Sequence, residues 1–217
     1  MTDNAVGAGL EGLVEGYRRF RSTDYPGQKR LFEDLAQGQT PQTMVVSCCD
    51  SRVDPARIFA AGPGELFVVR NVANLVPPFE ESGEHHGTSA AVEFAVTGLK
   101  VRNILVMGHA SCGGVKACLA GAEDAAAGGR FIGPWMSILA PARDEVLRRH
   151  ADASAEERQQ ALELAGIRQS LENLQTFPFV AEAVAAGELR LQGAYFSIAT
   201  GQLSLLDGAS GTFETVE

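Results

Sequence analysis

Long apolar runs and basic residues are both scarce in this sequence. It has no stretch of about 18 consecutive apolar residues, the length that a membrane-spanning helix needs, and its start has no basic segment followed by an apolar one, as a secretory signal would. Only 18 Lys and Arg stand against 27 Asp and Glu, for a formal net charge of −9. We therefore expect a cytoplasmic protein with no membrane and no nucleic-acid partner.

Cysteine is scarce too, with four residues among 217. Four thiols in a chain of this size do not make a disulfide framework, and cytosolic thiols usually stay reduced. Metal binding or catalysis is therefore the better use for cysteines placed at strand ends. The chain also lacks the glycine fingerprint that binds nucleotide phosphates, so no nucleotide is implied.

Apolar residues are abundant, at 45% of the chain, and their spacing alternates between that of strands and that of helices. Short β-branched runs predict five strands, at 43–48, 66–70, 103–107, 189–196 and 202–206. Helical spacing predicts helices over 9–21, 26–36, 88–99, 132–149, 153–176 and 178–186. This alternation predicts an α/β fold, with a mostly parallel central sheet of four to five strands flanked by helices. Residues 1–38 are expected to form an N-terminal helical arm, and residues 39–217 one α/β domain.

Two short segments contain the residues that bind soft metals. Cys48-Cys49-Asp50-Ser51-Arg52 ends the first predicted strand, and His109-Ala110-Ser111-Cys112 follows the third. Ligands of parallel sheets bind beyond the carboxyl ends of the strands, so these segments converge if their strands are neighbours. Two thiolates and one imidazole, with a fourth position open, are the pattern of a catalytic zinc site. We expect one zinc ion (Zn²⁺) per chain, on Cys48, His109 and Cys112.

The other thiols of the chain need a separate interpretation. Strand alternation and the spacing to Asp50 favour Cys48 over Cys49 as the ligand, although either thiol could reach the metal. Free cysteine is among the most buried residue types, and we interpret Cys49 and Cys118 as core residues.

Asp50 and Arg52 stand two residues apart and can pair through charge-assisted hydrogen bonds in a tight turn. Such pairing lowers the pKa of Asp50 and keeps its carboxylate an acceptor, which would orient an oxygen bound to zinc. Two alternatives stay open. The pair could be a simple turn clamp, or Asp50 could be a fourth zinc ligand that closes the site.

Three motifs follow one another along the chain: Cys48-x-Asp50-x-Arg52, Phe67-Val-Val-Arg70-Asn71-Val-Ala-Asn74 and Gly108-His109-x-x-Cys112-Gly-Gly114. In this order they resemble the β-class carbonic anhydrases, over about residues 39–119. The resemblance implies zinc-dependent, reversible hydration of carbon dioxide to bicarbonate and a proton, with zinc-bound hydroxide as the attacking group. It places the zinc ligands on Cys48, His109 and Cys112, and the catalytic pair on Asp50 and Arg52.

The resemblance also implies residues that hold the substrate. They are Gln39, the apolar pocket residues Phe67 and Val72, and the backbone N–H of Gly113; a tyrosine of the plant-like subgroup is replaced by Phe94. Family members are dimers or larger, with the N-terminal helices across the partner and Gln39 in the neighbour's site. A homodimer or a higher homo-oligomer is therefore implied.

A second subgroup of that family is inhibited by bicarbonate at a site made of a tryptophan, an arginine and a tyrosine. Val45 and Phe196 occupy two of these positions here, and only Arg70 remains. The resemblance therefore implies the open-site subgroup, with Asp50 held by Arg52. His85 or His86 is a candidate to pass the proton to solvent, and the alternative is that both are ordinary loop residues.

Two other functions fit the same residues. A carbonyl sulfide or carbon disulfide hydrolase on this fold would need the same zinc chemistry and would differ only in access to its pocket. A non-enzymatic protein with structural zinc, or a redox sensor, would need four protein ligands, and the Asp50–Arg52 pair argues against it.

Overall fold

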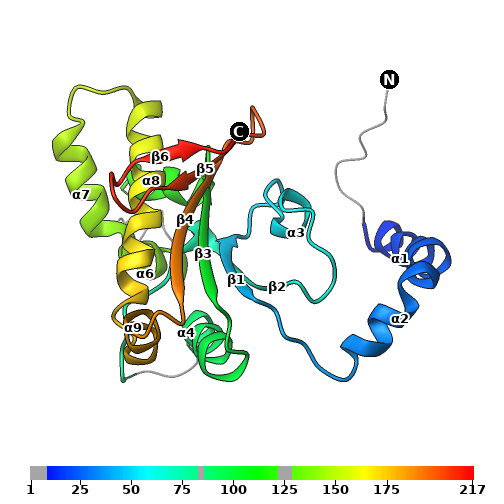
Figure 1. Ribbon diagram of the computed structural model, residues 1–217. Helices are drawn as coiled ribbons and strands as arrows, with labels where there is room; N and C mark the ends of the chain where they lie inside the picture. Colours follow the sequence, from blue (N-terminus) through cyan, green and yellow to red (C-terminus); the bar gives the residue numbers. More distant parts are fainter. Residues whose placement is uncertain (1–8, 83–85, 122–128) are drawn as a thin grey trace. The chain divides into compact units, whose positions relative to one another are not determined.

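The structure is a computed structural model, and it describes residues 9–82, 86–121 and 129–217. The chain divides into two compact units, Met1–Gln39 and Thr40–Glu217, which are presented separately below (Figure 1). Among the described helices, none combines the length and the apolar character needed to cross a bilayer.

The first unit is helical. It contains α1 (Leu10–Arg19), a π-helical turn η1 (Phe20–Asp24) and α2 (Tyr25–Leu35). The rings of Phe20, Tyr25 and Phe32 pack against one another, with centroids 5.4–6.1 Å apart, and hold η1 to α2. The apolar side chains of α1 are exposed, and they are Leu10, Leu13, Val14 and Tyr17. Helix α1 therefore has an apolar face that its own unit leaves uncovered.

The second unit is built on a six-stranded sheet in the order β2-β1-β3-β4-β5-β6. The strands are β1 (Thr43–Cys48), β2 (Leu66–Asn71), β3 (Asn103–His109), β4 (Arg190–Phe196), β5 (Leu203–Leu206) and β6 (Phe213–Thr215). The pairings among β2, β1, β3 and β4 are parallel, and β5 and β6 add antiparallel pairs at one edge. The predicted α/β fold with a mostly parallel sheet is confirmed. The prediction of four to five strands was one short, because β6 has three residues, too few to show alternation.

Helices connect and flank these strands. They are α3 (Pro55–Ile58), the 3₁₀ turn η2 (Val72–Asn74), α4 (Gly87–Glu93), the π-helical turn η3 (Phe94–Gly98), α5 (Gly113–Leu119), α6 (Ile132–Met136), the 3₁₀ turn η4 (Ser137–Leu139), α7 (Ala140–Arg149), α8 (Ala155–Leu174) and α9 (Pro178–Ala185). The single helix predicted over 132–149 is divided into three pieces. Pro141 lies in the first turn of α7, where its missing N–H costs no helical hydrogen bond, and it begins a new helix there.

Helix α8 packs against β3 and β4 and covers one face of the sheet (Figure 1). Two glycines on these strands permit the close approach, because a Cβ atom on Gly108 or Gly193 would lie 2.8 or 2.9 Å from the Ile167 side chain. Alternation along β1 directs Met44 and Val46 into the main core. Helix α8 thus lies directly behind the strand that ends at His109.

Candidate metal centre

Cys48, His109 and Cys112 come together at the carboxyl ends of two adjacent strands. Cys48 is the last residue of β1 and His109 the last of β3, and these strands are parallel neighbours. Cys112 is the N-cap residue of α5. Their ligand atoms all lie within 4.8 Å of one another, and all three residues are buried. We call these three residues the ligand cluster.

The other two thiols lie outside the ligand cluster. Cys118 is buried, as expected, but Cys49 is exposed, so the prediction that Cys49 is a core residue was wrong. The reason is its position in the exposed turn after β1, where the sheet no longer covers it.

The donor atoms of the ligand cluster suit a soft metal cation. The Cys48 and Cys112 sulfurs are 4.0 Å apart. His109 Nδ1 donates to the Ala110 carbonyl at 2.9 Å, which leaves the lone pair on Nε2. Nε2 is buried, and no described residue bonds to it. An unpartnered buried nitrogen is costly unless a ligand satisfies it, so the cluster fits a metal ion.

The pKa values of the ligand cluster reflect its packing. The Cys112 hydrogen bond lowers the pKa of the Cys48 thiol, and the resulting thiolate together with burial raises the pKa of Cys112, because the pair shares one proton. Burial lowers the pKa of His109, but the neighbouring Cys48 sulfur and the hydrogen bond to the Ala110 carbonyl outweigh burial and raise it overall. One thiol is therefore poised to ionise beside the imidazole.

Asp50 and Arg52 form a two-pronged ion pair at the edge of the ligand cluster. Arg52 donates from Nε to Asp50 Oδ1 at 2.8 Å and from Nη2 to Oδ2 at 2.6 Å, and its backbone N–H also donates to Oδ1. The Arg52 guanidinium holds the pKa of the Asp50 carboxyl well below its usual range. Asp50 Oδ2 lies 4.0 Å from His109 Nε2. The carboxylate thus faces the cluster while both of its oxygens are held by Arg52.

Arg70 holds the turn that carries this pair. It donates from Nε to the Cys48 carbonyl at 2.8 Å and from Nη2 to the Asp50 carbonyl at 2.7 Å. Its Nη1 pairs with Asp54 Oδ2 at 3.1 Å. One guanidinium therefore fixes the backbone on both sides of Cys49.

The residues predicted to hold substrate are only partly brought together. Val72 packs in the core cluster that contains Cys48 and Cys112, and Gly113 begins α5 directly after Cys112. Phe67 pairs with Met44 on β1 and stacks on Phe94, with ring centroids 5.8 Å apart.

Phe67 and Gln39 do not belong to the segments that carry the ligand cluster. Phe67 is at the level of Met44, four residues before Cys48, and so lies about 13 Å from it along the sheet. Gln39 belongs to the first unit, not to the unit that contains the ligand cluster. Of the two histidines, His85 lies outside the described residues, and His86 immediately precedes α4.

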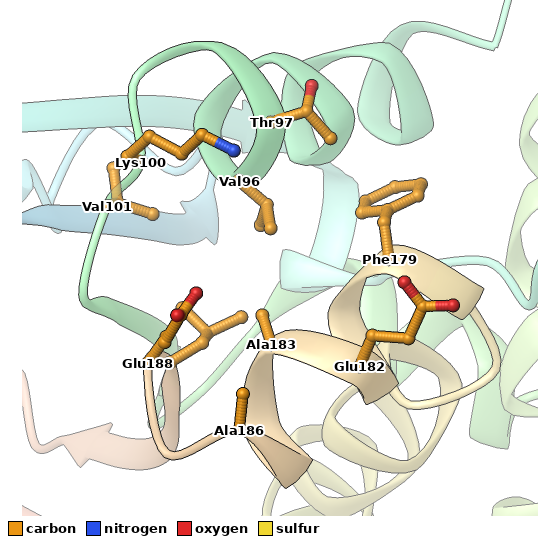
Figure 2. Close-up of a pocket in the computed structure, with 10 residues that line it drawn as sticks. Val96, Thr97, Lys100, Val101, Phe179, Glu182, Ala183, Ala186 and Glu188 are labelled. Carbon is orange, nitrogen blue, oxygen red and sulfur yellow. The ribbon is translucent and has the colours of Figure 1, made fainter.

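A separate cavity of about 390 Å³ lies at the opposite ends of the strands, between η3 and α9 (Figure 2). Val101 and Leu189, which precede β3 and β4, line it together with Lys100 and Glu182. His109 is at the far end of β3, so this cavity is distinct from the ligand cluster.

Sequence patterns missed three residues behind the ligand cluster. The buried Glu163 on α8 accepts hydrogen bonds from the Cys112 backbone N–H and the Gln159 side chain, both at 2.9 Å. The Tyr195 hydroxyl donates to the other Glu163 oxygen at 2.8 Å. The signal in the sequence was the charged residue Glu163 beside Leu162 on the apolar stripe of α8. A charge at such a buried position needs hydrogen-bond partners.

Comparisons with known proteins agree on one family. A family profile described as "Carbonic anhydrase" matches residues 43–203. Beta carbonic anhydrase 3 of Arabidopsis thaliana is 38% identical over 198 residues, which cover 90% of this chain and 76% of the relative.

Solved structures agree with this match. That of the beta-carbonic anhydrase CcaA superposes with a TM-score of 0.91 at 31% identity, over 96% of this chain and 100% of that one. A structure described as tetrameric, from Sordaria macrospora, has a TM-score of 0.75 at 28% identity, over 91% of this chain and 96% of that one.

Proposed function

This chain belongs to the carbonic anhydrase family, in its β class, and from that membership we propose that it catalyses the reversible hydration of carbon dioxide to bicarbonate with one zinc ion. The observation that carries the proposal is the ligand cluster beside the Asp50–Arg52 pair. Three nitrogen and sulfur donors converge there, and Arg52 engages the adjacent carboxylate. A three-ligand site leaves one position for a reactant, as catalytic zinc sites do.

Cys48, His109 and Cys112 are the residues that would hold the zinc. Two zinc–sulfur bonds of about 2.3 Å at a tetrahedral angle separate the sulfurs by about 3.8 Å, close to the 4.0 Å between these two. Zinc in such a site lowers the pKa of a water ligand and thereby provides a nucleophile at neutral pH. The Nδ1 bond of His109 to the Ala110 carbonyl fixes the tautomer with Nε2 free to bind.

Asp50 and Arg52 are the proposed catalytic pair. Because Arg52 keeps Asp50 ionised, the carboxylate only accepts hydrogen bonds. Asp50 Oδ2 would accept a hydrogen bond from the attacking oxygen and turn a lone pair of that oxygen toward carbon dioxide. Bidentate pairing with Arg52 also makes Asp50 unfavourable as a fourth zinc ligand, since that role would break these bonds.

The proposed substrate site surrounds this pair. Val72 would form its apolar wall, and the Gly113 N–H at the start of α5 would stabilise negative charge on the product oxygens. Gln39 and Phe67 complete the proposal as substrate-binding residues. Because Phe67 lies about 13 Å from Cys48 of its own chain, its proposed role requires a site to which a second copy of the chain contributes.

The proposed assembly is a homodimer or a higher homo-oligomer. The exposed apolar face of α1 supports it, and so does the tetrameric relative. We propose that residues 1–38 are the arm that contacts the partner and residues 39–217 the catalytic domain. The proposed location is the cytoplasm, where Cys48 and Cys112 would stay reduced despite their proximity.

Stopped-flow measurement of carbon dioxide hydration, with zinc quantified per chain, tests the function. We expect one zinc per chain in the wild type, and loss of both zinc and activity in Cys112→Ser. Cys118→Ser is the matched control, since Cys118 is a buried thiol outside the cluster, and it should retain both. Full activity of zinc-free Cys112→Ser would contradict the proposal, and turnover of carbonyl sulfide with poor carbon dioxide hydration would redirect it to that substrate.

A further inference from the structure

A single peptide group in the loop that carries Cys112 is held from both sides by opposite charges. The Ser111 carbonyl oxygen accepts a hydrogen bond from Arg52 Nη2 at 3.2 Å. The Cys112 N–H, on the same peptide group, donates to Glu163 Oε1 at 2.9 Å. The negative end of the peptide dipole thus faces a guanidinium and its positive end faces a carboxylate. A rotation of this peptide would break both bonds.

The backbone next to this peptide is strained. Ser111 has a φ of 57°, in the left-handed region that residues other than glycine, asparagine and aspartate seldom occupy. Such a conformation persists when surrounding contacts enforce it. Arg52 and Glu163 supply those contacts, one on each end of the peptide. The two charged side chains therefore hold the peptide group in its strained conformation.

Glu163 is well placed to act as a rigid anchor. It is 4% exposed and projects from α8, the long helix behind β3 and β4 (Figure 1). Gln159 donates to its Oε1 and also contacts the Cys112 carbonyl at 3.4 Å. Tyr195 donates to Oε2 at 2.8 Å, so both oxygens are satisfied without solvent. The Gln159 bond fixes the oxygen that accepts from the Cys112 N–H, whereas Tyr195 satisfies only the other oxygen.

We propose that Glu163 is a positioning residue which, through the Ser111–Cys112 peptide, aims the Cys112 sulfur at the ligand cluster and keeps Arg52 on Asp50. The proposal rests on the metal role of the cluster given above. Glu163 is 51 positions from Cys112 in the sequence and touches no reacting atom. It acts on two parts of the site at once, because the peptide group is rigid.

The test compares Glu163→Gln with Tyr195→Phe. The glutamine side chain keeps the shape but loses the charge, and a neutral hydrogen bond to the Cys112 N–H is about half as strong. Tyr195→Phe removes the bond to the other carboxylate oxygen and is the matched control. We measure zinc release to a chelator and the thiolate charge-transfer band of the cobalt(II)-substituted protein. Glu163→Gln should release zinc about 10-fold faster and shift the band, whereas Tyr195→Phe should stay within about twofold of wild type.

Ser111→Gly provides a second readout that a merely structural role would not move. Glycine takes the left-handed conformation without strain, so in this background the Glu163→Gln effect on zinc release should shrink from about 10-fold to about threefold. If Glu163→Gln alone does not fold, zinc release is compared between Ser111→Gly and the double variant Ser111→Gly/Glu163→Gln. Equal zinc release and equal spectra for Glu163→Gln and Tyr195→Phe would overturn the proposal, as would an undiminished effect in the Ser111→Gly background. A wild type that binds no zinc would overturn the proposed function instead.

Discussion

Gly113 and Gly114 are adjacent at the start of α5, yet the space around them differs. A Cβ atom on Gly114 would lie 2.8 Å from Val72 Cγ1 and 3.2 Å from Ala73 Cβ, whereas one on Gly113 would meet nothing within 4 Å. We expect Gly114→Ala to lower the free energy of unfolding by about 1–3 kcal/mol through overpacking. Gly113→Ala, the control, should leave it unchanged in urea denaturation. Equal losses of unfolding free energy in the two variants would show that the close contact with Val72 is not the reason for glycine at position 114.

Arg70 makes three of its contacts to the turn that carries Asp50. Lysine at this position keeps the charge, but a single ammonium cannot reach the carbonyls of both Cys48 and Asp50 in the geometry of a guanidinium. We expect Arg70→Lys to retain zinc and to lower kcat/KM for carbon dioxide hydration by about 10-fold, as loss of a supporting contact does. Arg57→Lys, at an exposed position of the neighbouring helix α3, is the control. A variant with wild-type kcat/KM would refute this role.

At the scale of elements, α8 begins with a reciprocal pair of hydrogen bonds. The Ser154 hydroxyl accepts from the Glu157 N–H at 3.2 Å, and the Ser154 N–H donates to Glu157 Oε2 at 2.7 Å. The Ser154 hydrogen bonds lower the pKa of Glu157. Ser154→Ala should therefore cost about 1 kcal/mol of unfolding free energy, measured by urea denaturation.

The same cap gives a pH dependence with a defined sign. The folded pKa of Glu157 lies below its unfolded value of about 4.3. Its contribution is thus present above that pH and is lost as the pH falls toward the folded pKa. Glu157→Gln should have a lower Tm than wild type at pH 7, and the difference should narrow as the pH falls below about 4.3. Glu156→Gln makes the same charge change in the same turn and serves as the control for the loss of one negative charge.

At the scale of the whole molecule, α1 exposes an apolar face that suits a second copy of the chain. Leu13 is 63% exposed on this face. We expect Leu13→Asp to shift the protein toward monomer in sedimentation velocity and to lower activity with it, because burying a charge in an interface is unfavourable. Glu15→Gln, a change on the same helix, should leave the oligomer intact. An unchanged sedimentation coefficient for Leu13→Asp would exclude this face from the assembly.

The sequence by itself determined the features that are local. The β-branched run before Cys48 and the one before His109 predict strands, and parallel neighbours must bring their ends together. The spacing between Asp50 and Arg52 likewise predicts a contact that a single turn can make. The strands and the Asp50–Arg52 contact needed only short-range geometry. The meeting of the predicted ligands also needed these two strands to be neighbours, and the structure pairs them.

Tertiary structure alone decided the features that depend on distant parts of the chain. Glu163 is hydrogen-bonded to Cys112, 51 residues away, and to Tyr195, 32 residues away. Sequence periodicity can indicate that Glu163 is buried, but it cannot identify these partners. Cys49 is exposed because of where the sheet ends, not because of its residue type. Phe67 lies far from Cys48 because of strand register, which a motif does not encode. Local patterns specify which atoms can react, whereas long-range packing specifies what holds them in place.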